Sequence, residues 1–181
     1  RCARAGGGVG GAGALESLRR APERLTRVAV IDASPLAETP QSAAAREMVI
    51  VKVKSGRLAD AMREELNPVW LAPGPDRAAI LEIALDMADT LGPEVYVRQA
   101  RALQRARDQQ AVLRKCKVPT LVMCGEVGRL NPVKRHSFMA ELLPYAILRV
   151  IEGAGHLPTL EQPDATTAAI KEWLKMPLTP A

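Results

Sequence analysis

Short apolar runs alternate along the chain with longer segments whose apolar residues recur at helical spacing. Residues 27–31, 118–124 and 146–151 are runs of this kind, bounded by polar residues, glycine or proline, and such runs predict buried strands. Residues 11–20, a segment that begins at Asn131-Pro132, and residues 164–175 are expected to be helices. Strands that alternate with helices are typical of an α/β fold, so the pattern predicts a parallel sheet with flanking helices.

Residues 36–115 interrupt this alternation, because they carry helical patterns alone. Helices are expected over residues 39–54, 57–71, 76–90 and 92–114, with a break in the second at Asn67-Pro68. The third helix carries a wide apolar stripe that is expected to be buried, formed by Ile80, Leu81, Ile83, Ala84, Leu85, Met87 and Ala88. One crossover between strands rarely needs so long a connection, which favours an inserted helical cap over an ordinary helical layer.

The resulting division places a core domain at residues 1–35 and 116–176, a cap at 36–115 and a flexible tail at 177–181. The first strand would lie in the poorly apolar segment 1–5, with an unpaired outer edge. Such an edge favours self-association with another chain.

Composition narrows the classes of partner. Hydrophobic residues make up 48% of the chain and aromatic residues 3%, so the core must be largely aliphatic. The net charge is +5, but the arginines are scattered along the chain. The densest row is Arg98, Arg101 and Arg105, which falls at helical spacing with few aromatic residues nearby. This pattern indicates a solvated helix face rather than a nucleic-acid surface. His136, among Lys134, Arg135 and Ser137, is expected to be a surface residue.

The three cysteines, Cys2, Cys116 and Cys124, have no metal-ligand spacing, so neither a metal nor a disulfide framework is predicted. A reducing, cytoplasmic location is expected. No apolar stretch is long enough for a membrane span and no signal peptide is recognised. The sequence begins at Arg1 without methionine, which is expected of a fragment or a processed chain.

A lone histidine follows the last predicted strand. Gly153 and Gly155 allow a sharp turn after residue 151, and His156 stands at its crest before Pro158. A fixed backbone with a free imidazole is the arrangement that a general base needs. The alternative is a histidine that only bonds its own loop.

A glycine-rich turn near the start allows two interpretations. Gly8, Gly10 and Gly13 satisfy the G-x-G-x-x-G pattern of dinucleotide-binding turns, and Asp32 follows at about the distance expected of a ribose-binding acid. The weakly apolar segment before the turn, and the lack of a second nucleotide-binding half, argue against that interpretation.

Three segments resemble the α/β-hydrolases, the family of serine esterases, C–C bond hydrolases and haloperoxidase-like enzymes. Residues 148–163 resemble the family's histidine loop, and residues 119–132 resemble its seventh strand and acid-bearing turn. Residues 5–24 resemble the nucleophile elbow, G-x-S-x-G, and its helix. The resemblance implies the C-terminal part of an α/β-hydrolase fold, with an inserted cap over an apolar pocket.

The resemblance also assigns positions for the catalytic groups. His156 matches the base by motif, and the backbone N–H of Val9 matches one oxyanion donor; the other donor would precede Arg1. The nucleophile position is Gly8 and the acid position is Gly128, so neither carries a reactive side chain. Some members carry the acid after the sixth strand, where Asp32 falls, although Asp32 could equally cap a turn.

Lower-ranked substitutes for the acid or nucleophile are Glu126 and Ser34, but neither would lie on the elbow. Loss of a triad serine costs roughly 10⁶ in turnover, so the chain is expected to be a very poor hydrolase or none. We therefore expect an α/β-hydrolase with esterase-like ancestry and a capped apolar pocket, inactive or truncated, that could take a small apolar ligand or ester. The alternatives are a non-catalytic ligand-binding module of the same fold and a dinucleotide-binding oxidoreductase fragment. For the hydrolase or module, no cofactor, metal, nucleic acid or membrane is expected.

Overall fold

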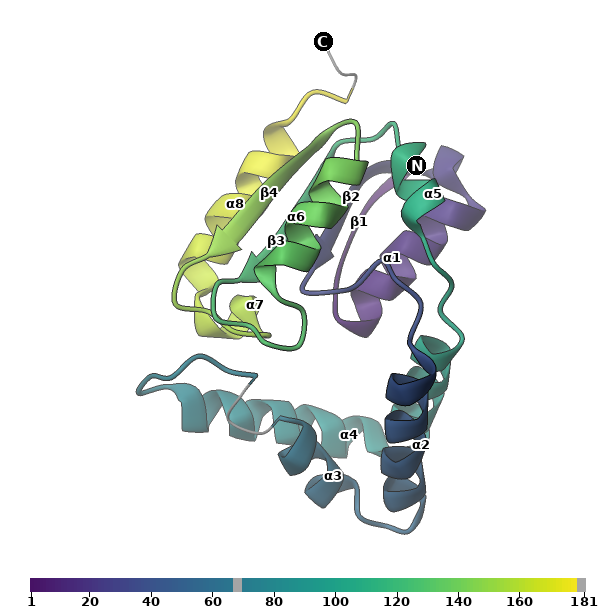
Figure 1. Cartoon of the computed structure of the whole chain (residues 1–181). Coiled ribbons are helices and arrows are strands. Elements are labelled where there is room, and N and C mark those ends of the chain that lie inside the picture. Colours follow the sequence, from purple (N-terminus) through teal and green to yellow (C-terminus); the bar gives the residue numbers. More distant parts are fainter. Residues whose placement is uncertain (67–69, 179–181) are drawn as a thin grey trace.

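The computed structural model describes residues 1–66 and 70–178, and it is built around a four-stranded sheet (Figure 1). The strand order is β1-β2-β3-β4 and every neighbouring pair is parallel. The strands are β1 (Cys2–Gly7), β2 (Leu25–Ile31), β3 (Thr120–Gly125) and β4 (Ala146–Ile151). The predicted α/β fold with a parallel sheet and flanking helices is confirmed.

Helices cover both faces of the sheet because strand residues alternate in direction. On one face, Val28, Val30 and Val122 pack with apolar residues of α1 (Val9–Arg20), α5 (Gln110–Arg114) and α6 (Val133–Leu142). On the other face, Leu121 and Met123 pack with α8 (Pro163–Lys175). Two short elements complete the core: η1 (Pro22–Arg24) before β2 and α7 (Pro158–Glu161) before α8.

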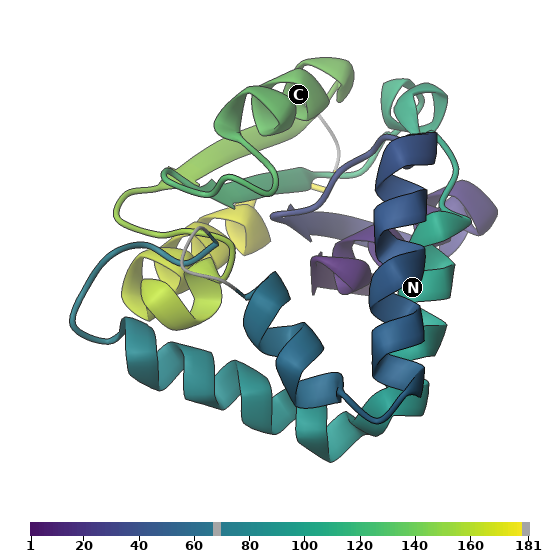
Figure 2. The same cartoon turned by 60° about the horizontal axis from the view of Figure 1, so that its bottom comes forward.

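The long segment between β2 and β3 forms a separate group of helices near the ends of the strands (Figures 1 and 2). It contains α2 (Pro40–Lys54), α3 (Leu58–Glu65) and α4 (Arg77–Gln104). Val53, Leu58 and Ala61 are buried together there, with Tyr96 and Val97 of α4 packed against them. These three helices therefore share a small apolar core of their own, and the pictures place them beside the carboxyl ends of the strands.

Two expectations for these helices are wrong. The helix expected over 92–114 is divided, because α4 ends at Gln104 and α5 is separate; the expected boundary at Gly92 is present as a kink within α4, where the chain turns at φ 79°. The apolar stripe of α4 is buried at Ile80, but Ile83 is 46% and Met87 57% exposed. Helical periodicity identifies an apolar face, but it does not show whether another element covers that face.

The second helix of the group also ends earlier than expected. α3 stops at Glu65, and Leu71 is buried outside any helix. The expected break at Asn67-Pro68 lies outside the described residues, since residues 67–69 are not among them.

Strand β1 forms one edge of the sheet, and β4 forms the other. In the part of the chain that the structure describes, β1 pairs with β2 alone, and most of its residues are exposed. An open parallel edge offers N–H and C=O groups to another strand, so we expect the isolated chain to self-associate as concentration rises. Light scattering over a concentration series measures this; a constant monomer mass at high concentration would contradict the expectation.

Among the described helices, none combines the length and apolar character that crossing a membrane requires.

Candidate active site

A sharp turn joins β1 to α1 at Gly8. Gly8 has φ 51° and ψ −118°, a conformation that side-chain-bearing residues rarely adopt, and its N–H donates to the carbonyl oxygen of Ile31 at 3.1 Å. The helix then lies directly against the strands. A Cβ atom at Gly6 would overlap the backbone of Gly10, and one at Gly11 would come within 2.6 Å of Ala33 Cβ. The glycines thus permit a strand–turn–helix unit with Gly8 at its apex.

The loop that carries His156 is fixed by contacts with two other segments. The His156 N–H donates to the carbonyl oxygen of Trp70 at 2.6 Å, and the Trp70 ring meets the imidazole edge-on, with centroids 5.4 Å apart. The Glu161 carboxylate accepts from the N–H groups of Gly155 at 2.9 Å and Leu157 at 2.8 Å. The backbone on both sides of the histidine is therefore held, which leaves the imidazole as the group that faces the pocket.

Asp32 follows β2 and meets this imidazole. Its side chain is 1% exposed, and its Oδ1 lies 2.8 Å from Nδ1 of His156. Asn131 Nδ2 donates to the same Oδ1 at 3.1 Å and to the Asp32 carbonyl oxygen at 3.0 Å. A carboxylate at Nδ1 fixes that nitrogen as the N–H donor, so Nε2 carries the free lone pair. The pair thus has the geometry of an oriented base.

The free Nε2 of His156 points at the apex of the turn. A Cβ atom built on Gly8 would lie 3.9 Å from Nε2. Apart from the two residues next to Gly8 in the chain, no other described residue has a heavy atom within 4 Å of that position. Gly128 approaches the same cluster from the turn after β3, where a Cβ would lie 3.4 Å from Asp32 Oδ2. The positions predicted for base, nucleophile and acid therefore meet in space, together with Asp32.

The amide of Val9 opens α1, so its N–H belongs to the first helical turn, where no intrahelical acceptor exists. It lies directly after Gly8, as one oxyanion donor would. Ser34 and Glu126, the lower-ranked substitutes for the acid or nucleophile, bind backbone N–H groups of turns instead. The Ser34 hydroxyl accepts from the Leu36 N–H at 3.2 Å, and the Glu126 carboxylate accepts from the Gly153 N–H at 3.2 Å.

A cavity of about 640 Å³ opens above Gly8 and His156, between the carboxyl edge of the sheet and helices α2 and α4. Much of its wall is apolar, with Ala, Val, Leu and Trp side chains. The polar groups of the wall are largely paired: Arg46 with Glu38, and the Tyr96 hydroxyl, which donates to Glu65 at 2.6 Å. Burial, reinforced by Glu65, raises the pKa of Tyr96, so its phenol stays protonated and neutral.

His136 is buried, so the expectation of a surface residue is wrong. It is 0% exposed, and its Nδ1 lies 3.3 Å from the carbonyl oxygen of Pro132. The polar neighbours Lys134 and Arg135 concealed this placement. The signal was present in the spacing, because His136 and the apolar Met139 are three residues apart on α6, and both are buried.

The burial of His136 should make the fold sensitive to acid. Desolvation lowers the pKa of His136, although the charge of Asp32 opposes this. The unfolded chain then binds a proton more readily than the folded chain, so stability falls as pH drops below the ordinary histidine value of about 6.5. We expect His136→Gln to show a smaller loss of free energy of unfolding between pH 7.5 and pH 5 than the parent. Urea denaturation at both pH values measures this, and an equal loss would contradict it.

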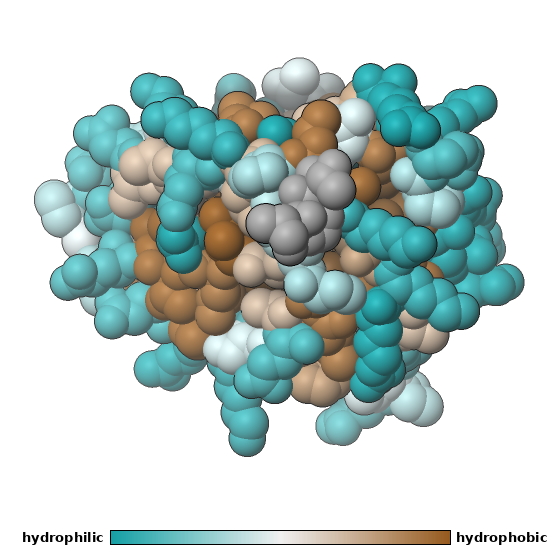
Figure 3. All heavy atoms as spheres, turned by 90° about the horizontal axis from the view of Figure 1, so that it is seen from above, coloured by the Kyte–Doolittle hydropathy of each residue, from teal (hydrophilic) through white to brown (hydrophobic). Residues whose placement is uncertain are grey.

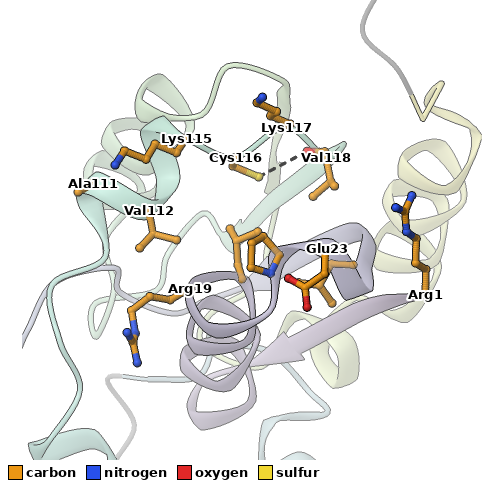
Figure 4. A pocket seen from close by; sticks show the side chains of 12 residues that line it. Arg1, Arg19, Glu23, Ala111, Val112, Lys115, Cys116, Lys117 and Val118 are labelled. Carbon is orange, nitrogen blue, oxygen red and sulfur yellow. Dashed lines mark hydrogen bonds between the residues drawn. The ribbon is translucent and has the colours of Figure 1, made fainter.

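A second cavity, of about 680 Å³, lies at the opposite end of the sheet (Figure 4). Leu25 and Val118, at and just before the starts of β2 and β3, line it, with Lys115, Lys117 and Arg19 beside them. Figure 3, seen from above, shows apolar surface exposed between hydrophilic side chains at this end. β2 separates this cavity from Asp32, so it takes no part in the site at His156.

The placement of Asp32 and of the glycines argues against the dinucleotide-binding interpretation. Asp32 is buried and bonded to His156 and Asn131, so its carboxylate is not free for a ribose. The third glycine of the pattern, Gly13, is not needed for close packing of the helix on a strand, because a Cβ there would meet the Arg4 side chain at an ordinary 3.6 Å. The described residues contain no cluster of metal-ligating side chains. Burial raises the pKa of the Cys124 thiol to about 12, so it stays protonated.

Comparison with known proteins agrees with this geometry. A family model described as "Alpha/beta hydrolase family" matches residues 5–170. A protein of Pseudomonas savastanoi pv. phaseolicola named "Putative carbamate hydrolase RutD" is 29% identical over 90% of this chain and 63% of its own length. The chain thus spans less than two thirds of that relative.

Solved structures show the same fold. A thermophilic esterase from Thermogutta terrifontis superposes with a TM-score of 0.91 at 26% identity, over 97% of this chain and 65% of the esterase. An enol-lactonase from Burkholderia xenovorans LB400 superposes with a TM-score of 0.80 at 22% identity, over 95% of this chain and 65% of the lactonase.

Proposed function

Because the chain belongs to the alpha/beta hydrolase family, we propose that it binds small acyl compounds, esters in particular, in the cavity above Gly8 and His156. We propose further that residues 36–115 act as a cap over this cavity, and that the chain lacks the nucleophile through which a serine esterase forms an acyl-enzyme. The chain spans about 65% of the esterase and lactonase structures. Any activity of a complete protein toward such compounds is therefore a proposal as well. We also propose a reducing, cytoplasmic location.

The observation that carries the proposal is the conformation of Gly8. Its backbone has the sharp strand-to-helix turn of an elbow and aims its missing side chain at a base held by a carboxylate. The residue itself offers no atom that could attack a carbonyl carbon. The proposed ligand binding needs no nucleophile at this position, whereas acyl-enzyme formation does.

The class of ligand follows from the wall of the cavity. Apolar side chains of α2 and α4 face the oriented base, and a volume of about 640 Å³ suits a small organic molecule. The relatives are named an esterase, an enol-lactonase and a carbamate hydrolase. The substrate classes in these names share a carbonyl carbon bonded to oxygen or nitrogen. An acyl group at Gly8 with an apolar tail toward α2 and α4 fits these features.

Binding of a short-chain ester tests the proposal. Calorimetry, or the NMR signals of His156 in a chain that has only two histidines, reports binding directly. Ala45→Trp fills the cavity wall from α2 and should weaken binding at least about tenfold, since tight packing leaves no room for both groups. Ala44→Trp is the matched control: it is adjacent on the same helix, exposed, and outside the cavity wall. Equal binding in both variants would contradict the proposed site.

A purely non-catalytic binding module is the second candidate, and Gly8 favours it as well. A complete esterase-like protein would consume a bound ester, whereas a binding module would leave it intact. An ester that stays intact on the parent chain for many hours would identify a binding module.

A further inference from the structure

We propose that the Asp32–His156 pair transfers acyl groups from a bound ester directly to a small external nucleophile, which occupies the place that the side chain would take at Gly8. Water is such a nucleophile, and so is a small alcohol or hydroxylamine. This inference rests on the proposed binding of acyl compounds in the same cavity. It adds an activity that needs no nucleophile from the protein.

The space at Gly8 supports the inference. A Cβ at this position would have one neighbour within 4 Å among the described residues beyond those adjacent in the chain, and that neighbour is Nε2 of His156 at 3.9 Å. A hydrogen bond between a water or hydroxyl oxygen and an imidazole nitrogen spans about 2.8 Å, so the oxygen would lie near the position of the missing Cβ or hydroxyl. Glycine therefore leaves room for a molecule of this size beside the base.

The polar groups around this space favour proton removal. The Asp32 carboxylate at Nδ1 keeps the lone pair of His156 on Nε2, and it stabilises the imidazolium that forms. Asn131 holds the carboxylate in place from the turn before α6. The base is thus oriented by groups that do not depend on a serine.

The reaction balances without a covalent enzyme intermediate. The nucleophile's oxygen, or nitrogen for hydroxylamine, attacks the ester carbonyl carbon as its proton passes to Nε2 of His156. The negative charge that develops on the carbonyl oxygen faces the N–H of Val9 and the positive end of α1. The C–O bond to the leaving alcohol then breaks, and this alkoxide takes the proton from His156. Water yields the carboxylic acid, and hydroxylamine yields the hydroxamate.

Hydroxylamine with a short-chain, weakly activated ester tests the inference on the full chain. We expect hydroxamate to form above the protein-free background at a rate that rises linearly with hydroxylamine, without an initial burst. His156→Ala should reduce the protein-dependent rate to background. Gly8→Ala should reduce it at least about tenfold, because the added methyl group occupies the space beside Nε2.

Gly8→Ala also carries backbone strain, since φ 51° with ψ −118° is a sparsely populated conformation that costs a residue with a side chain about 1–3 kcal/mol. Circular dichroism and binding of the ester verify that the variant folds. Gly10→Ala is the control in the same turn, because a Cβ there would meet nothing within 4 Å, and it should retain the parent rate.

Three results would overturn the inference: a rate unchanged by His156→Ala, a burst with acylated protein in the parent chain, or no rate above background while the ester still binds. In the third case the proposed binding function stands and the acyl transfer is wrong. Failure of the ester to bind at all would reject the proposed function and this inference together.

Discussion

Gly8→Ser is expected to give a chain that reacts covalently with fluorophosphonates, at a rate at least about 10³ above the parent. The Cβ of the new side chain would lie 3.9 Å from Nε2 of His156, so one of its rotamers brings the hydroxyl within hydrogen-bond reach of the base. Loss of a triad serine costs roughly 10⁶ in turnover, and installing one should recover part of that factor. Covalent labelling followed by mass spectrometry measures the rate and locates the adduct.

Two controls separate a built nucleophile from a general increase in reactivity. Gly8→Ala carries the same backbone strain without a hydroxyl, and it should not label. Gly10→Ser adds a hydroxyl in the same turn at a position whose Cβ meets nothing within 4 Å, so it lies away from His156 and should also not label. Labelling of the parent, lost in His156→Ala, would show instead that another residue is the nucleophile.

The parts of the fold that depend on local pattern could be predicted from the sequence. The last strand was expected at residues 146–151 and is β4, because a short apolar run between turn residues is a strong local signal. The helix expected from residue 39 to 54 is α2, which Thr39 caps by accepting from the Ser42 N–H. Proline and glycine marked the turns that position His156.

Features that depend on distant neighbours could not be predicted in the same way. From the sequence, Asp32 could be either a catalytic acid or a residue that caps a turn. Its contact with His156, 124 positions away, is set by the order of strands in the sheet. Burial was misjudged in both directions. His136 is buried despite its polar neighbours in the sequence, and Ile83 is exposed although it belongs to an apolar stripe. In each case tertiary packing decides whether the side chain is buried, and a short stretch of sequence carries no information about that packing.

Asp32→Asn, made in the Gly8→Ser chain, is expected to lower the labelling rate by about 10³–10⁴. The amide would place an N–H₂ donor or a weaker acceptor beside Nδ1, so the imidazole could adopt the tautomer that has no lone pair on Nε2. Loss of the equivalent acid costs roughly 10⁴ in well-studied serine proteases. The rate of fluorophosphonate labelling reports the change, and an unchanged rate would show that Asp32 only supports the turn.

Moving the carboxylate to the turn after β3 tests the same contact from the other side. A Cβ at Gly128 lies 3.4 Å from Asp32 Oδ2, so Gly128→Asp in the Asp32→Asn, Gly8→Ser chain brings a new carboxylate to the same region and should recover about 10² of the lost rate. With Asp32 retained, the same substitution forces two carboxylates together in a buried site, where their repulsion disfavours two charges. That chain should therefore unfold at lower temperature at pH 8 than the one with Asp32→Asn. Thermal unfolding of the two chains measures this difference. Equal unfolding midpoints would mean that the new side chain points away from Asp32. Any recovery of the labelling rate would then need another explanation.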